Sequence, residues 1–253
     1  MVKAPKHISW EILHRQHPRF YQYSYFILKE IKKEIIFFAD QIMKRGKKYK
    51  ILDMGCWNKP YAMFFSWYEE YIWSDLIEWS LVDVICDNDN LPFEDNYFDH
   101  LLCSQVLEHT KNVDGAIQEM KRVVKKDWLL FVSVPFLFPE HACPRDYWRF
   151  TRFGLQEKFK DFEMLSIRNN TWYFITIALF INLLFTKGET MRTIFTPFFL
   201  VINSIAFLLD FLLLKVVCQF LGLRKIRFIH WIIENTYKQF TSDYMMILKN
   251  SKK

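Results

Sequence analysis

Apolar residues recur along this chain with two different periods, and each period predicts a kind of element. Between residues 20 and 45 they are spaced three and four apart with lysines between them, which predicts an amphipathic helix. Short apolar runs predict seven strands at residues 50–54, 71–75, 81–86, 98–104, 128–134, 162–168 and 242–248. Strands that alternate with helices or turns are typical of a parallel sheet with helices packed on it.

A long apolar stretch lies between the last two predicted strands. Residues 172–185 are apolar and uncharged, and residues 193–209 repeat this character before Asp210. A membrane span needs about 20 apolar residues. The first run is too short, and the second reaches that length only by including Pro197, Asn203 and Asp210.

Strands six and seven are expected to pair at one edge of the sheet, so the stretch between them must begin and end on the same side of a membrane. This pairing excludes a single crossing. We therefore expect a helical hairpin, residues 172–223, that lies on or dips into the cytosolic leaflet, with Arg224, Lys225 and Arg227 available to anionic headgroups. The alternative is a set of helices folded over the pocket or buried in a dimer interface.

These patterns divide the chain into four segments. Residues 1–48 form an N-terminal helical cap, 49–170 a sheet core, 171–238 an apolar helical insertion, and 239–253 the last strand of the core with the tail.

The segment Ile51-Leu-Asp-Met-Gly-Cys-Trp-Asn-Lys-Pro-Tyr61 carries the first chemical signal. An apolar strand that ends near Asp53 and enters a turn at Gly55 is how an open α/β sheet builds a nucleotide-type pocket. Asp75 follows 20 residues after Gly55, at the end of the second strand. A carboxylate at that place can accept hydrogen bonds from both hydroxyls of a ribose.

Three further segments make the pattern more specific: DMGC at 53–56, CDNDNLPFEDNYFD at 86–99 and VLEH at 106–109. In this order and spacing, residues 45–168 resemble the class I S-adenosylmethionine-dependent methyltransferases of the UbiE-like (type 11) group. The resemblance implies a Rossmann-like, seven-stranded, mostly parallel sheet, here with the apolar insertion before its last strand. It implies S-adenosyl-L-methionine as cofactor, held by Asp53, Gly55, Asp75, Asp87 and Ser104, with Asp87 near the adenine amino group.

The chain departs from that family at one position. Where the family has glycine, two residues after Gly55, this chain has Trp57. A second glycine lets backbone approach the ligand closely. Either the turn is re-aimed and the indole packs beside the cofactor, or the pocket is damaged and the protein is a non-catalytic relative.

A second motif follows the fifth strand, in which residues 141–151 fit the pattern H-x-x-P-x-D-Y-W-R-F-T. Its loop is expected at the carboxyl edge of the sheet, where a substrate binds. We predict that His141 accepts a proton from a hydroxyl nucleophile and that Asp146, Tyr147 and Arg149 bind the substrate. An equally weighted alternative is that Asp146 and Arg149 form a purely structural pair.

His109 is a second candidate for the catalytic base, because it follows the fourth strand. The alternative is a residue at a helix start whose ring is satisfied by backbone, with Glu108 favouring the positive end of that helix. Methyl transfer from a sulfonium centre is an in-line displacement of an already activated group, so we expect no metal to be required.

Composition and charge indicate which partners and which cellular compartment to expect. The net charge of +6 is accompanied by no interleaved Arg-aromatic repeat, so no nucleic-acid partner is expected. The five cysteines lack zinc-binding spacing and suggest a reducing compartment. The first ten residues contain no apolar signal-peptide core. Together these features predict a cytoplasmic protein, peripheral or monotopic at the inner face of the membrane.

The sequence thus predicts a methyltransferase that acts on a lipid-linked or membrane-proximal small molecule or glycan, with a sugar hydroxyl or a quinone-like group as the acceptor. Two rival hypotheses are an inactive scaffold that still binds the cofactor and a membrane-anchored interaction protein. The sequence leaves the acceptor, the methylated atom and the oligomeric state open.

Overall fold

The computed structural model describes residues 10–46, 48–55, 60–66, 68–78, 81–185, 189–212 and 241–251. These residues fall into two compact units, each described here by itself. The sheet unit comprises Met1–Gln16, Ile31–Arg168 and Tyr244–Lys253, and the helical unit comprises His17–Glu30 and Asn169–Asp243. Trp57 and the basic residues Arg224, Lys225 and Arg227 lie outside the described residues, so the predictions that concern them stay predictions.

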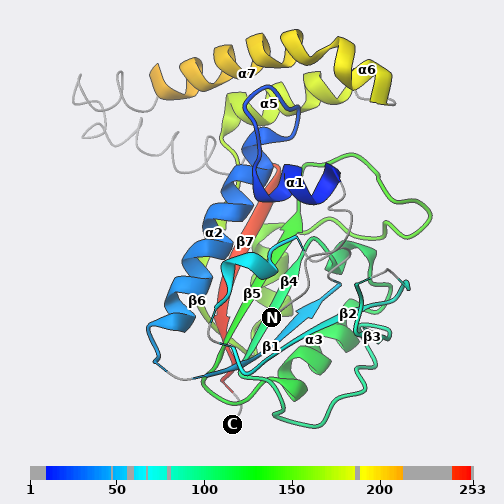
Figure 1. Cartoon of the computed structure of the whole chain (residues 1–253), viewed down its shortest axis with the longest axis vertical. Coiled ribbons are helices and arrows are strands. Elements are labelled where there is room, and N and C mark those ends of the chain that lie inside the picture. The colour runs from blue at the N-terminus through cyan, green and yellow to red at the C-terminus, as the bar shows by residue number, and fades with distance from the viewer. Residues whose placement is uncertain are drawn as a thin grey trace. The chain divides into compact units, whose positions relative to one another are not determined.

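The sheet unit is built on one seven-stranded sheet with the order β3-β2-β1-β4-β5-β7-β6 (Figure 1). Its strands are β1 Lys50–Met54, β2 Glu70–Asp75, β3 Val84–Ile85, β4 His100–Ser104, β5 Leu129–Pro135, β6 Glu163–Asn169 and β7 Asp243–Lys249. β7 lies between β5 and β6, which confirms the predicted pairing of the sixth and seventh strands.

The third strand is shorter than the predicted 81–86. Asp83 explains the difference, because its Oδ2 accepts a hydrogen bond from the Trp73 backbone N at 2.9 Å. A side-chain carboxylate takes the place of a strand carbonyl there, so regular pairing between β2 and β3 begins only at Ser74 and Val84.

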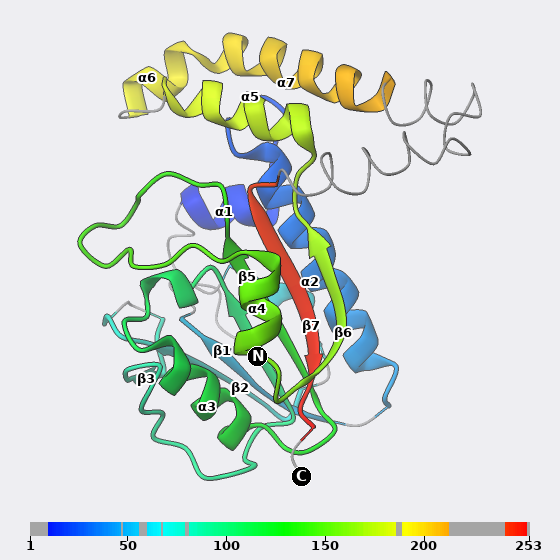
Figure 2. The same ribbon diagram turned by 180° about the vertical axis from the view of Figure 1, so that it is seen from behind.

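The register brings several strand ends to one edge. Strands β1 to β5 pair in parallel, with Met54 beside Ser74 and Cys103, and Ser104 beside Ser133. In Figure 2 the arrow of β7 points opposite to those of β5 and β6. The Rossmann-like, mostly parallel sheet is therefore confirmed, and its carboxyl edge carries the loops after β1, β2, β4 and β5.

Helices cover both faces of this sheet. The sheet unit contains α1 Trp10–Gln16, the part of α2 (Tyr25–Met43) that begins at Ile31, α3 Val113–Val123 and α4 Arg152–Lys158. In Figure 2, α3 and α4 lie in front of the sheet and α2 lies behind it. The residues of α2 that repeat every three or four positions, Ile31, Ile35, Phe38 and Ile42, are at most 1% exposed, so the predicted amphipathic helix packs on the sheet as its period requires.

The helical unit contains α5 Tyr173–Leu183, α6 Glu189–Ile194 and α7 Thr196–Phe211. Polar residues that interrupt the apolar sequence hold it together. The Asn182 side-chain amide donates to Asn203 Oδ1 at 2.9 Å, and the Asn203 amide donates to the carbonyls of Phe20 and Gln22. Asp210 accepts from the backbone N of Phe174 and of Ile175, at the first turn of α5.

The exposed face of α7 is more apolar than its buried face. Phe199, Asn203, Ala206 and Asp210 are buried. Val201, Ile205, Leu208 and Leu212, which also repeat at helical spacing, are 54%, 51%, 53% and 40% exposed. Among the described residues, no helix is both long enough and apolar enough to cross a membrane.

Candidate functional site

The turn after β1 is tight and needs glycine. Gly55 has φ +69°, and a Cβ added there would lie 2.4 Å from Val106 Cγ1. Its backbone N donates to the carbonyl of Ser74 at 2.8 Å, which ties the turn to β2. Any larger residue would have to displace Val106 and adopt a strained backbone.

Asp53, in the same strand, is buried at 3% exposure and accepts a hydrogen bond from the Tyr71 hydroxyl at 3.1 Å. Its carboxylate is thus anchored to β2, directly before the glycine turn.

The other predicted cofactor residues occupy the ends of neighbouring strands. Asp75 ends β2, and its Oδ1 accepts from the backbone N of Ile77 at 3.0 Å. Asp87 is exposed just after β3, and Ser104 ends β4 with its hydroxyl 3.0 Å from that of Ser133. These residues share one edge of the sheet, as the sequence predicted, and their binding role stays a prediction.

The chain leaves β4 through an unusual residue. Gln105 has φ +59°, in the left-handed region that non-glycine residues seldom adopt. Its backbone N and side-chain amide donate to the carbonyl and the hydroxyl of Ser133 on β5. This turn leads directly into a three-residue 3-10 helix, Leu107–His109.

That short helix carries Glu108 and His109 and corrects one expectation. Glu108 is fully buried, and a single 3-10 turn is too short to build the helix dipole with which we expected it to interact. The following helix, α3, is capped by Asn112 instead, whose side chain accepts from the Gly115 backbone N. His109 Nδ1 lies 2.6 Å from the Arg145 carbonyl oxygen, and since a carbonyl can only accept, Nδ1 carries the proton.

The loop between β5 and α4 is organised around Asp146. Its side chain is 1% exposed and receives two hydrogen bonds of 2.7 Å from the Arg149 guanidinium and one of 2.8 Å from the His141 backbone N. Arg149 also donates to the carbonyls of Phe138 and Pro139. The pairing of Asp146 with Arg149, given above as the structural alternative, is therefore present, and the pair fixes the shape of the loop. The predicted role of both residues in substrate binding stays a prediction.

Tyr147 and Trp148 connect this loop to the 3-10 helix. Their backbone N atoms donate to the Glu108 carbonyl, and the Trp148 indole N donates to the Thr110 carbonyl at 3.0 Å. The Tyr147 side chain is 45% exposed and remains available to a ligand. Its predicted contact with substrate stays a prediction.

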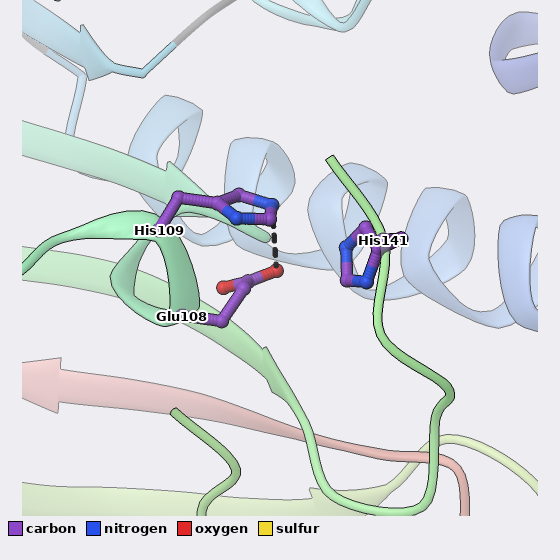
Figure 3. Close-up of side chains that lie close together, drawn as sticks. All are labelled: Glu108, His109 and His141. Carbon is purple, nitrogen blue, oxygen red and sulfur yellow. Dashed lines mark ion pairs between the residues drawn. The ribbon is translucent and has the colours of Figure 1, made fainter. Parts of the chain in front are cut away.

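Loop and helix together place the two predicted catalytic histidines side by side. The rings of His109 and His141 lie 4.8 Å apart between centroids, at an interplanar angle of 76°. His109 Nε2 lies 3.9 Å from Glu108 Oε1, the contact drawn as a dashed line in Figure 3, where the carboxylate of Glu108 lies beside the ring of His109. We call Glu108, His109 and His141 the histidine cluster.

Electrostatics in the loop follow from these contacts. The Arg149 guanidinium lowers the pKa of Asp146 to about 2, so this carboxylate is ionised at neutral pH. Burial lowers the pKa of His141, so its imidazole is neutral there. Burial also raises the pKa of the Cys86 thiol to about 11 and that of Cys103 well above its usual range, so both thiols are protonated at neutral pH.

Two contributors to this site were not singled out as functional residues from the sequence. Glu108 was expected only to interact with a helix, although a Glu-His pair directly after a strand is itself a signal for clustered chemistry. Gln105 gave no signal, because nothing in the sequence of β4 predicts a positive φ at its end.

Comparison with known proteins finds a family model that matches part of the sheet unit. Residues 69–132, from β2 into β5, match the family model described as a methyltransferase domain. No curated protein sequence matches the chain.

Two solved structures show the same fold at low identity. The [4+2]-cyclase SpnF is 15% identical, with a TM-score of 0.51 over 86% of this chain and 81% of its own. A putative sarcosine dimethylglycine methyltransferase from Galdieria sulphuraria is 12% identical, with a TM-score of 0.51 over 87% of this chain and 85% of its own.

Proposed function

We propose that the chain is an S-adenosylmethionine-dependent methyltransferase whose acceptor is a hydroxyl on a membrane-proximal or lipid-linked molecule. The family match carries the first part of this statement, because it includes Asp75, Asp87, Ser104, Glu108 and His109. Assignment to the UbiE-like group within the class remains a prediction.

The residues at the carboxyl edge fit the cofactor. Gly55 keeps the turn after β1 tight at this edge, because a Cβ there would meet the side chain of Val106. The carboxylate of Asp75, at the end of the neighbouring strand, suits a ribose. S-adenosyl-L-methionine would supply an activated methyl group there.

The histidine cluster supplies the acceptor end of the reaction. As the methyl group moves to the acceptor oxygen, a C–S bond breaks, a C–O bond forms, and sulfur keeps the electron pair. The hydroxyl proton must leave, and the imidazole of His141, whose pKa is lowered by burial, can accept it, with the ring of His109 beside it at the same edge of the sheet. Asp146 and Arg149 hold the loop in which His141 lies.

Titration calorimetry with S-adenosyl-L-methionine and its demethylated product tests the cofactor assignment. Asp75→Ala should weaken binding by about 1–3 kcal/mol, the scale of lost charge-assisted hydrogen bonds. Asp161→Ala is a matched control, since that carboxylate is 70% exposed and lies outside this edge. Equal affinity of the wild type and a folded Asp75→Ala variant would show that the ribose assignment is wrong.

The scaffold hypothesis depends on Trp57 and has its own test. If the indole packs beside the cofactor, its fluorescence should respond to cofactor, and Trp57→Gly should bind at least as well as the wild type. Failure of both proteins to bind would contradict the cofactor assignment, whereas binding without methyl transfer would favour the inactive scaffold.

The membrane part of the proposal is supported by the exposed face of α7. An aliphatic stripe of Val201, Ile205, Leu208 and Leu212, opposite a buried face that contains Asn203 and Asp210, is unfavourable in water. Such a face suits the boundary between headgroups and acyl chains, where a helix lies in the plane of the membrane. An acceptor held at that surface would then be within reach of a protein bound to the same membrane.

Flotation with vesicles of phosphatidylethanolamine and phosphatidylglycerol tests this part. The full chain should float, and the double variant Ile205→Glu, Leu208→Glu should not. Lys126→Glu, at an exposed position of the sheet unit, changes the net charge by the same amount and should float like the wild type. If the wild type does not float and the double variant instead turns a dimer into a monomer, the stripe is a subunit interface, and the methyltransferase assignment stands without the membrane.

A further inference from the structure

We propose that the histidine cluster binds a divalent transition-metal ion, Zn²⁺ in the first place, through Glu108, His109 and His141. One ligand atom from each of the three side chains lies within 4.8 Å of the others. Two imidazoles and one carboxylate form a ligand set typical of catalytic zinc sites, which leave coordination positions open for a substrate. The inference goes beyond methyl transfer itself, for which we expected no metal to be required.

The two histidines have the tautomer that metal ligands need. His109 Nδ1 donates to the Arg145 carbonyl at 2.6 Å, which leaves the lone pair on Nε2, the nitrogen nearest to Glu108. His141 Nδ1 faces the Pro139 carbonyl at 3.2 Å. Because both Nδ1 atoms face carbonyl acceptors, both Nε2 atoms are left to bind a metal.

Asp146 lies near the Nδ1 atoms of both rings, whereas the proposed ion would bind their Nε2 atoms. Its carboxylate oxygens lie 3.3 Å from His141 Nδ1 and 4.0 Å from His109 Nδ1. Arg149 is 3.4 Å from His141 Nδ1, the longest contact of that atom, and its main hydrogen bonds go to Asp146. A carboxylate that orients ligating histidines through their second nitrogen is the usual outer layer of a zinc site.

Metal binding requires the ligand atoms to move closer together. Bonds of about 2.1 Å to a tetrahedral ion place ligand atoms about 3.4 Å apart. Glu108 Oε1 and His109 Nε2 are 3.9 Å apart and need to approach by about half an ångström, whereas a pair at the 4.8 Å limit of the cluster needs to approach by about 1.4 Å. The side chains of His109 and His141 are 26% and 34% exposed, so rotation of these rings can complete the site while the buried Glu108 stays fixed.

The place of the cluster gives the ion a role in the proposed function, and this part of the inference rests on that function. Glu108 and His109 follow β4, and His141 follows β5, both at the carboxyl edge that carries Gly55 and Asp75. An acceptor oxygen bound at an open position would lose its proton more readily, since a metal ion stabilises the oxyanion. In that case the histidines act as ligands, and the hydroxyl proton passes to water instead of to an imidazole.

Metal binding can be measured without any methyl acceptor. Metal-free, tag-free full-length protein is titrated with Zn²⁺ by calorimetry and with Co²⁺ by visible absorption. We expect one ion per chain and d–d bands of a tetrahedral or five-coordinate site. His141→Ala should weaken binding by about 100-fold or more, as expected when one of three ligands is lost, and Glu108→Gln should do the same.

Two controls identify the ligands. His17→Ala removes an exposed histidine elsewhere and should leave the affinity unchanged. Cys143→Ser removes an exposed thiol of the same loop and should also leave it unchanged. Binding that survives His141→Ala but is lost with Cys143→Ser would overturn the proposed ligand set, and absence of stoichiometric binding would overturn the metal site and leave the histidines as bases.

The open positions and the cofactor have separate readouts. Acetohydroxamate, a bidentate oxygen ligand, should shift the Co²⁺ bands of the loaded protein, and unchanged bands would contradict an open site. Asp75→Ala should lose affinity for S-adenosyl-L-methionine and keep its affinity for Zn²⁺. A protein that binds the cofactor but no metal overturns this inference alone, whereas one that binds metal but no cofactor overturns the proposed function alone.

Discussion

The sheet unit and the helical unit each bury a carboxylate, and they stabilise it in different ways. Asp146 in the loop after β5 is held by a full opposite charge, through two hydrogen bonds from Arg149. Asp210 in α7 is held by the backbone N–H groups of Phe174 and Ile175 at the start of α5. The first carboxylate depends on a partner's charge, and the second on partial charges that no side-chain substitution removes.

The helices of the two units differ in a similar way. α2 buries an apolar stripe against the sheet, so its hydrophobic period reports its packing. α7 buries Asn203, Ala206 and Asp210 and exposes aliphatic residues, so the spacing of its hydrophobic residues does not predict which face is buried. Hydrophobic pattern is therefore a good guide to the sheet unit and a poor guide to the helical unit.

The largest effect should come from removal of the charge that neutralises Asp146. Arg149→Met leaves a nearly fully buried carboxylate without its ionic partner, and we expect a loss of roughly 3–5 kcal/mol in the free energy of unfolding. Urea unfolding measures it. Asp146→Asn combined with Arg149→Met should recover part of the loss, and a single variant within 1 kcal/mol of the wild type, on the scale of an exposed ion pair, would contradict the comparison.

Disruption of the neutral hydrogen-bond network around Asn203 in the helical unit should cost less stability than loss of Arg149. Asn203→Leu leaves the carbonyls of Phe20 and Gln22 and the amide of Asn182 without this partner, at a cost of about 2–3 kcal/mol. Thermal unfolding should show the loss, and Ser204→Leu, one residue further at an exposed position, serves as the control. A stabilised Asn203→Leu variant would mean that the network fixes geometry and adds nothing to stability.

His100 extends the comparison to a buried group with no ionic partner. It lies fully buried between Phe38, Tyr49 and Trp128, and burial lowers its pKa to about 3. Below pH 6.5, the ordinary pKa of histidine, His100 binds a proton in the unfolded chain but not in the folded protein. The contribution of His100 to the free energy of unfolding is therefore fully present above pH 6.5 and is lost as the pH falls toward 3. This one group should contribute a loss of about 2 kcal/mol between pH 7 and pH 5.

The measurement compares wild type with His100→Phe, which keeps an aromatic ring and cannot titrate. Urea unfolding at both pH values should show a smaller loss for the variant by that amount. Parallel losses in the two proteins would mean that His100 is not the group responsible.

The smallest effect should come from the charge on Asp210. Asp210→Asn keeps an acceptor near the first turn of α5, so we expect a loss of only about 0.5–1 kcal/mol from the weaker interaction with the helix N-terminus. Asp210→Leu, which removes the acceptor, should cost more. Thermal unfolding measures both variants. Equal losses of stability for Asp210→Asn and Asp210→Leu would show that the charge of Asp210, and not its hydrogen bonds, stabilises the start of α5.

Much of the sheet could be predicted, because strands that are buried on both faces appear in the sequence as short apolar runs. The predicted 50–54 coincides with β1, and the others lie within one or two residues of theirs except β3, where Asp83 replaces a backbone partner. The pairing of β6 with β7 was also predicted, although about seventy residues separate them.

In the candidate site, the sequence identified the members but not how they meet. His109 was predicted from one motif and His141, Asp146 and Arg149 from another, and the fold brings the two motifs together at one edge. The place of Glu108 beside the two histidines could not be predicted, because it depends on the positive φ of Gln105 and the 3-10 turn that follows. Such local backbone choices follow from contacts with β5 that lie far away in the sequence.

The sequence by itself determined the order of strands and helices, the glycine that the first turn requires, and the residue types available for chemistry, since these depend on local periodicity and on single side chains. Only the tertiary structure decided which histidine nitrogens face carbonyl oxygens, that Asp146 lies near Nδ1 of both rings, and that Asn203 and Asp210 point inward while Ile205 and Leu208 face outward. These outcomes depend on partners distant in the chain. A polar residue in an apolar run is buried or exposed according to whether the fold offers it a hydrogen bond, and no local pattern carries that information.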